Sequence, residues 1–163
     1  MHEKSVGLLN KAVAMEIQAV HQYMYFHFHC DDQGYDLLAG LFKRTAIEEM
    51  GHVEDLAERI LFLKGEVELV ASREVDKVNE VTGMLGKSIE MEQMSIEDYN
   101  QFANECAQNS DSATKKLFED LVADEERHFD QYDTELDNIG KFAPAFGMIG
   151  TLIGLVKMLQ AME

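Results

Sequence analysis

Two short motifs in the sequence place a carboxylate and an imidazole three residues apart. They are Glu49-x-x-His52 and Glu125-x-x-His128. Residues three apart share one face of an α-helix, so each motif directs both of its side chains to one point. Carboxylate oxygens and imidazole nitrogens are ligands for divalent transition metals. The two motifs therefore indicate a metal site with one histidine for each of two ions.

Two further glutamates are related to each other by an internal repeat that also relates the motifs. A shift of 76 positions pairs Glu16 with Glu92, Glu49 with Glu125, and His52 with His128. A single Glu-x-x-His pair is commonplace on a solvated helix, but the repeat argues against that interpretation. Four carboxylates buried in an apolar bundle repel one another and lose hydration, and two divalent cations would compensate their charge. A ligand set of this kind holds di-iron or di-manganese sites in four-helix bundles.

Two tyrosines follow the lone glutamates at a fixed distance. Tyr23 and Tyr99 lie seven residues after Glu16 and Glu92, two turns along the same helix faces. An aromatic residue at such a position packs in the core, hydrogen-bonds a ligand carboxylate or serves as a radical relay. The sequence leaves these alternatives open.

Apolar residues with a 3.6-residue period predict four long helices, which span about residues 5–32, 35–64, 75–109 and 112–139. Short turns at 31–34 and 109–112 join them into two antiparallel hairpins. Gly65 is expected to cap the second helix and Gly140 to end the fourth. Residues 66–74 must cross the length of the bundle, because the two middle helices then run parallel.

The expected fold is therefore all-α and forms a single domain over residues 1–163. A four-helix bundle occupies about residues 5–140, and a short fifth helix occupies about residues 145–162. This last stretch is apolar, but three glycines and Lys157 interrupt it, so a membrane span is not expected.

The composition limits the partners of the protein. Thirty-one acidic residues against 14 basic ones give a net charge of −17, which argues against nucleic acid and favours cations. Cys30 and Cys106 are too few for a disulfide framework, and the helix lengths place them at opposite ends of the bundle. The N-terminus lacks the pattern of a secretory signal, so we expect a cytoplasmic protein.

The residues around these motifs resemble those of bacterioferritins, in the ferritin-like superfamily. The resemblance covers residues 9–139 and rests on Met15-Glu16, Gln22-Tyr23, Glu48-Glu49-Met50-Gly51-His52, 58–65, 124–128 and 134–137. It implies a ferritin-like four-helix bundle with a long crossover between the second and third helices. It also implies a ferroxidase centre in which Glu16 and Glu92 are terminal ligands, Glu49 and Glu125 bridge, and His52 and His128 supply nitrogen.

The resemblance further implies an activity and an assembly. Bacterioferritins oxidise Fe(II) with oxygen or peroxide and store the ferric mineral inside a 24-subunit homo-oligomeric shell built of dimers. Iron storage, detoxification and iron homeostasis are the expected functions, with a small ferredoxin as reductant. Met50 occupies the position that ligates a haem shared between two subunits, and it shares an apolar stripe with Ile47 and Leu61.

Other interpretations remain open at this stage. A di-iron peroxidase resembling rubrerythrin uses the same ligands without storing mineral, and a structural bundle would carry a vestigial site. The segment after Pro144 is longer and more apolar than a typical bacterioferritin tail. Its Gly150-x-x-x-Gly154 motif favours packing of these tails around a shell axis.

Overall fold

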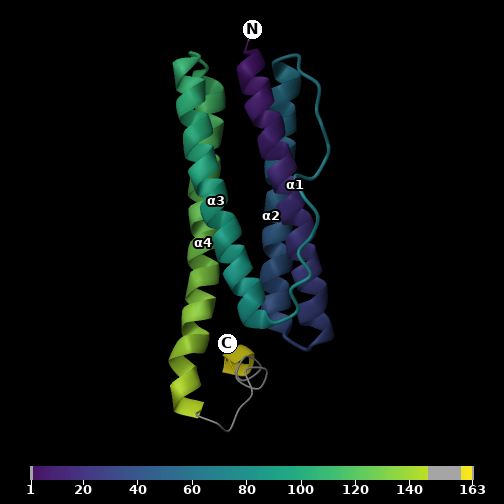
Figure 1. The fold of residues 1–163 in the computed structure, drawn as a ribbon, viewed down its shortest axis with the longest axis vertical. Helices are drawn as coiled ribbons and strands as arrows, with labels where there is room; N and C mark the ends of the chain where they lie inside the picture. The colour runs from purple at the N-terminus through teal and green to yellow at the C-terminus, as the bar shows by residue number, and fades with distance from the viewer. Residues whose placement is uncertain (1, 147–158, 163) are drawn as a thin grey trace.

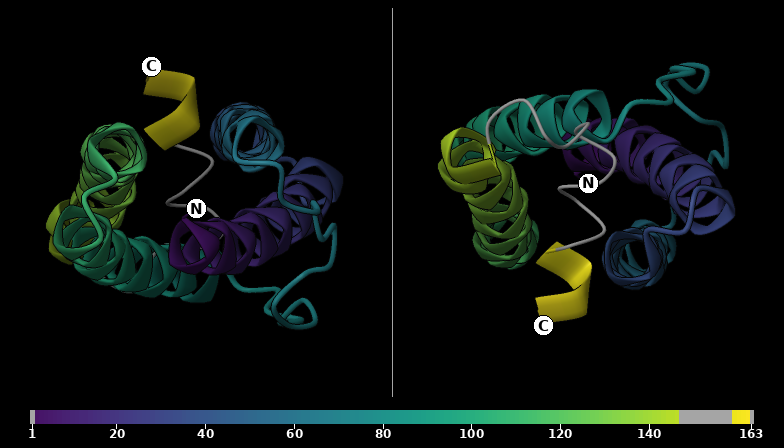
Figure 2. Two further views of the ribbon diagram at one scale, coloured as in Figure 1. Left: turned by 90° about the horizontal axis from the view of Figure 1, so that it is seen from above. Right: turned by 90° about the horizontal axis from the view of Figure 1, so that it is seen from below.

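The structure is a computed structural model that describes residues 2–146 and 159–162. Its long helices are α1 (Glu3–Asp32), α2 (Asp36–Phe62), α3 (Val81–Gln108) and α4 (Ser112–Phe146). The described residues contain no β-strand. α1 and α2 form one antiparallel hairpin, α3 and α4 form a second, and the hairpins pack side by side (Figures 1 and 2). The predicted all-α four-helix bundle is confirmed.

Residues 63–80 connect the two hairpins by running along α1 from one end of the bundle to the other (Figure 1). α2 and α3 therefore run parallel, as predicted. The side chain of Asn10 fastens the first part of this crossover, since its Nδ2 donates to the carbonyl of Glu66 at 2.9 Å and its Oδ1 accepts from the N–H of Glu68 at 3.0 Å.

α3 begins later than the sequence predicted. The predicted start was about Val75, but the helix begins at Val81. The backbone N–H and carbonyl of Asp76 both pair with the side-chain amide of Gln22 on α1, at 2.8 and 2.9 Å. This contact holds residue 76 in the crossover. It joins residues far apart in sequence, so a local pattern could not reveal it.

The predicted cap of α2 is also wrong by one residue. Lys64, and not Gly65, adopts the left-handed conformation, with φ of 64°. Gly65 serves a different purpose, because a Cβ atom at this position would lie 2.6 Å from Cγ1 of Val6. The glycine thus allows the end of α2 to approach the start of α1 closely.

α4 passes Gly140, where the sequence predicted its end, and continues to Phe146. One glycine costs a helix only about 1 kcal/mol, so Gly140 does not end α4. Ala145 and Phe146 belong to α4, so the predicted start of a fifth helix at about residue 145 is wrong. Residues 159–162 are helical, and the rest of the predicted fifth helix lies outside the described residues. In the described part of the chain, no helix is long and apolar enough to cross a membrane.

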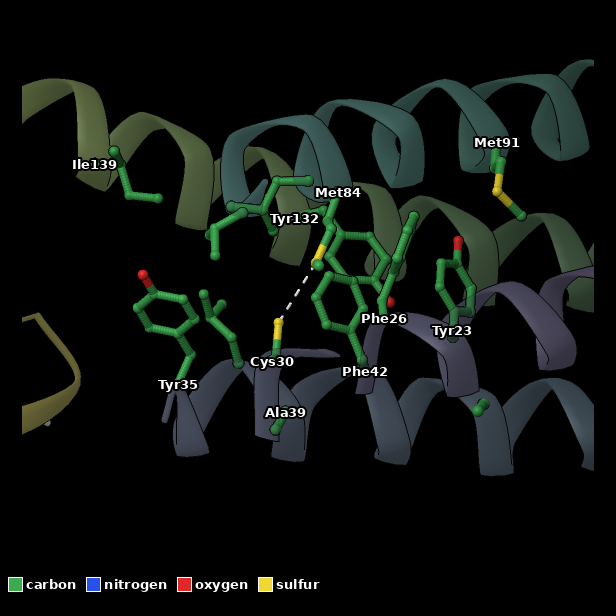
Figure 3. Packing of buried hydrophobic residues seen from close by; sticks show 14 residues of the cluster. Tyr23, Phe26, Cys30, Tyr35, Ala39, Phe42, Met84, Met91, Tyr132 and Ile139 are labelled. Atoms are coloured by element: carbon green, nitrogen blue, oxygen red, sulfur yellow. Dashed lines mark hydrogen bonds between the residues drawn. The ribbon is translucent and has the colours of Figure 1, made fainter. Parts of the chain in front are cut away.

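The apolar core divides into two clusters, which lie at opposite ends of the bundle. Figure 3 shows the cluster near the α1–α2 turn, where Phe26, Phe42 and Tyr132 pack together and the Cys30 thiol donates to Met84 Sδ at 3.5 Å. The second cluster includes Cys106. Both cysteines are buried and free, in agreement with their predicted placement at opposite ends.

Candidate metal centre

Six polar residues lie between the two apolar clusters, and each is at most 6% exposed. All four helices contribute at least one of them. They are Glu16 on α1, Glu49 and His52 on α2, Glu92 on α3, and Glu125 and His128 on α4. The structure thus brings all six predicted residues into one buried cluster.

The potential ligand atoms form two overlapping groups, and the atoms of each group lie within 4.8 Å of one another. The first group is Glu16, Glu49, His52 and Glu125, and the second is Glu49, Glu92, Glu125 and His128. Two glutamates, Glu49 and Glu125, belong to both groups. A carboxylate has two oxygens, so each of these side chains has the geometry to contact two ions at once.

The Nδ1 atoms of both imidazoles point into the cluster. His52 Nδ1 lies 2.8 Å from Glu49 Oε2, and His128 Nδ1 lies 3.0 Å from Glu125 Oε2. Despite this proximity, neither His52 Nδ1 nor Glu49 Oε2 makes a hydrogen bond of acceptable geometry. Buried polar atoms without partners are costly, so this convergence fits a donor set completed by metal ions.

The outer nitrogen of each imidazole contacts a carboxylate from the other hairpin. His52 Nε2 lies 3.1 Å from Asp124 Oδ2, and His128 Nε2 lies 2.8 Å from Glu48 Oε2. Arg127 Nη2 joins these two acids, donating to Glu48 at 2.6 Å and to Asp124 at 3.2 Å. Such contacts favour the tautomer with a proton on Nε2 and leave Nδ1 available to a metal.

Glu48 and Asp124 were not identified as site residues from the sequence, although the repeat contains them. The same shift of 76 positions places Glu48 on Asp124. Their side chains are 40% and 44% exposed, so each resembles an ordinary solvated acid beside the motif. Applying the repeat to every residue next to the two motifs would have found the pair.

Both tyrosines hydrogen-bond glutamates of the cluster, which is one of the roles that the sequence left open, and both also pack in the apolar core. Tyr23 donates to Glu92 and Tyr99 donates to Glu16, so each phenol reaches the glutamate of the other hairpin. Burial and the neighbouring glutamates raise the pKa of both phenols well above the usual range. The tyrosines therefore remain protonated and orient the two carboxylates.

Without metal, groups of the cluster hold protons because its carboxylates lie close together and away from water. Burial, followed by the charges of Glu16 and Glu92, raises the pKa of Glu49 to about 8. The pKa of Glu125 is raised well above its usual value for the same reason. Burial disfavours the imidazolium forms, but the surrounding carboxylates outweigh it and raise the pKa of both histidines.

These shifts predict that the stability of the metal-free protein falls as pH rises from about 5 to about 8. Between its pKa in the unfolded chain and its higher pKa in the folded chain, an acid with a raised pKa keeps its proton when folded and loses it when unfolded. Raising the pH in this range therefore favours the unfolded chain. Glu49 covers the range from 4.5 to about 8, and the histidines act in the same direction above 6.5. Thermal unfolding midpoints across this range test the prediction, and midpoints that rise with pH would contradict it.

Met50 lies outside the metal cluster. Its side chain is 57% exposed on the outer face of α2, between Ile47 at 53% and Leu61 at 59%. An exposed thioether within an apolar stripe is compatible with a ligand or an interface residue.

The fold and the buried cluster together define a ferritin-like protein, and residues 6–142 match the ferritin-like domain. Among characterised relatives, the bacterioferritin of Desulfovibrio desulfuricans is 38% identical over 88% of this chain and 78% of its own length. The bacterioferritin of Brucella melitensis is 33% identical over 85% of this chain and 86% of its own length. The chain belongs to the bacterioferritin family.

Solved structures agree with this assignment. The Rhodobacter capsulatus bacterioferritin, described with a metal-free dinuclear site and a haem iron, matches with a TM-score of 0.87 and 26% identity, over 97% of this chain and 94% of its own. The D. desulfuricans bacterioferritin, described with a di-iron site in different catalytic states, matches with a TM-score of 0.86 and 34% identity. The match covers 94% of this chain and 87% of that one. At the level of the ferritin-like class, the chain is an iron-storage protein of the di-iron type.

Proposed function

We propose that this chain is a ferroxidase subunit that oxidises Fe(II) and stores the ferric product. The observation that supports this most strongly is the sharing of Glu49 and Glu125 between two buried ligand groups. In this proposal Glu49 and Glu125 bridge two iron ions. Glu16 and His52 complete the ligands of one ion, and Glu92 and His128 complete those of the other.

The two iron ions are substrates, and each gives up one electron. Dioxygen takes two electrons and two protons to form hydrogen peroxide, and hydrogen peroxide takes two electrons and two protons to form two water molecules. The four carboxylates favour Fe(III) over Fe(II) because they compensate the higher charge. Binding of Fe(II) displaces protons held by the metal-free cluster, so metal affinity should increase with pH.

Glu48 and Asp124 are proposed to orient the histidine ligands. Glu48→Gln and Asp124→Asn should each weaken metal binding by about 10- to 100-fold, because the imidazole then loses its charged partner. Titration with Co(II), followed by its visible absorption, measures the affinity. Glu58→Gln alters an exposed acid on the same helix as Glu48 and should leave the affinity unchanged. Wild-type affinity in both test variants would contradict the proposed orientation.

Met50 is proposed to ligate a haem between two subunits, which would supply a route for electrons to the stored iron. Met50→Leu keeps the apolar surface but removes the sulfur, so the purified protein should lose its Soret absorption and keep its assembled mass. Met94→Leu changes an exposed methionine on α3 and should retain the haem. A Met50→Leu protein with an unchanged Soret band would exclude this ligand.

The proposed assembly is a cytoplasmic 24-subunit homo-oligomeric shell built of dimers, with a small ferredoxin as reductant. The exposed stripe of Ile47, Met50 and Leu61 supports a subunit interface, since apolar side chains of this size gain by burial. The net charge of −17 supports a shell that attracts cations.

Adding Fe(II) to the metal-free protein in air tests the function directly. A soluble ferric core retained by the assembled protein supports storage. Peroxide turnover without retained iron would instead indicate a rubrerythrin-like peroxidase. Oxidation no faster than in buffer would contradict both activities and would leave a structural bundle with a vestigial site.

A further inference from the structure

An open cavity of about 260 Å³ lies between α1 and α3 and extends to the buried cluster of glutamates and histidines. Tyr23, Glu49 and Glu92 line its inner end. Ser72 and Arg73 of the crossover line it as well, and the N–H of Ser72 donates to a backbone carbonyl of α1 at 2.9 Å. The crossover is thus fixed beside the cavity, which gives access to the cluster from this side of the bundle.

The walls of the cavity come from positions that the internal repeat relates. The shift of 76 positions pairs Met15 with Met91 and Ala19 with Ser95, and all four residues line the cavity. Figure 3 shows Met91 beside Tyr23, at the edge of the apolar cluster. The small side chains of Ala19 and Ser95 leave space where α1 and α3 meet, and the methionine side chains give the walls an apolar character.

The opposite side of the cluster has a different chemistry. Glu48, Asp124 and Arg127 lie there on α2 and α4, where Arg127 donates to both carboxylates and each carboxylate contacts a histidine. In the cavity, the opposite charges of Arg73 and Asp98 compensate each other, and Met15, Met91 and Met94 make much of the wall apolar. A cation would lose hydration to these side chains. Dioxygen has little hydration to lose on entering the cavity, and Gln18, Ser72 and Ser95 are lining residues with polar groups that suit hydrogen peroxide. The cavity has room for several such molecules.

We propose that this cavity binds the oxidant of the metal centre, a small neutral oxygen species such as dioxygen or hydrogen peroxide. This inference rests on the proposed ferroxidase function. The oxidant then approaches the iron ions from the side of α1 and α3. Each oxidant molecule takes two electrons and two protons, and each of the two Fe(II) ions supplies one of the electrons.

Xenon is a probe of the cavity that does not depend on activity. Xenon enters apolar protein cavities, so a crystal of the protein under xenon pressure should show an atom between Met15 and Met91. Ser95→Leu fills the space from one wall and should abolish that peak. A wild-type crystal with no xenon in the cavity would contradict the proposal.

The kinetic test separates the oxidant from the metal. Ser95→Leu should slow Fe(II) oxidation at low oxidant concentration by about tenfold, which corresponds to about 1.4 kcal/mol in the barrier, while Co(II) binding stays at the wild-type level. Met94→Trp narrows the cavity at its exposed side and serves as a second variant if Ser95→Leu does not fold. Gln101→Leu adds an apolar side chain on the exposed surface of α3 and should oxidise Fe(II) at the wild-type rate.

Each oxidant is tested separately. Slower reaction with dioxygen alone, with peroxide alone or with both supports the proposal and identifies the species admitted. Wild-type rates with both oxidants in a folded Ser95→Leu or Met94→Trp protein would overturn it. A wild-type protein that oxidises no Fe(II) would refute the ferroxidase function, and xenon binding would then still report on the cavity.

Discussion

Glu49→Gln should abolish rapid Fe(II) oxidation and at the same time stabilise the metal-free protein. The amide resembles a protonated carboxyl group and cannot bridge two cations as a carboxylate does. We expect the oxidation rate to fall by at least about a hundredfold, equal to about 2.7 kcal/mol. Stopped-flow absorption of the ferric product measures this loss.

The stability gain follows from the pKa of Glu49, which is raised to about 8. Wild-type and Glu49→Gln proteins should be equally stable below about pH 4, and the variant should become increasingly more stable than the wild type as pH rises from there to about 8. Glu54→Gln on the exposed side of α2 should change neither oxidation nor stability. A Glu49→Gln protein that oxidises Fe(II) at the wild-type rate would remove Glu49 from the proposed centre.

Asp111→Ala should produce a large loss of stability at a position outside the metal centre. Asp111 is 3% exposed and caps α4, accepting hydrogen bonds from the N–H and the Oγ1 of Thr114 at 3.1 and 2.6 Å. It also accepts from Nη2 of Arg59 on α2, at 2.8 Å. The residue therefore joins the two hairpins, and its removal leaves Arg59 without its carboxylate partner.

The expected cost is about 3 kcal/mol, or about 6–12 °C in the thermal midpoint of a chain of this size. Although burial opposes it, hydrogen bonds from Thr114 and the charge of Arg59 lower the pKa of Asp111 to about 2. Its contribution is therefore present above pH 3.8 and is lost as pH falls through about 2. Asp120→Ala removes an exposed pair with Lys116 on the same helix and should cost less than about 1 kcal/mol. Equal effects of the two substitutions would contradict the assigned contacts of Asp111.

The helices and the six residues of the cluster were predictable because local rules determine them. The 3.6-residue period defines which face of each helix is buried, and the 76-residue repeat marks Glu16, Glu49 and His52 together with their counterparts. Both patterns relate residues that lie a few positions apart or that the shift of 76 positions pairs. No contact between distant segments was needed.

The features that were missed depend on such distant contacts. The pairing of Gln22 with Asp76 delays the start of α3, and the approach of Val6 explains Gly65. The link from Glu48 to His128 crosses between hairpins and involves a half-exposed acid. The cavity arises where Ala19 and Ser95 meet, which only the packed bundle reveals.

The most direct test of the account is the crystal structure of the protein soaked in Fe(II) without oxygen, with anomalous scattering used to locate iron. We predict two iron peaks per chain within the buried cluster, with Glu49 and Glu125 contacting both, His52 contacting one and His128 the other. Iron bound elsewhere with this cluster unchanged, or a single ion without shared carboxylates, would contradict the proposed di-iron centre.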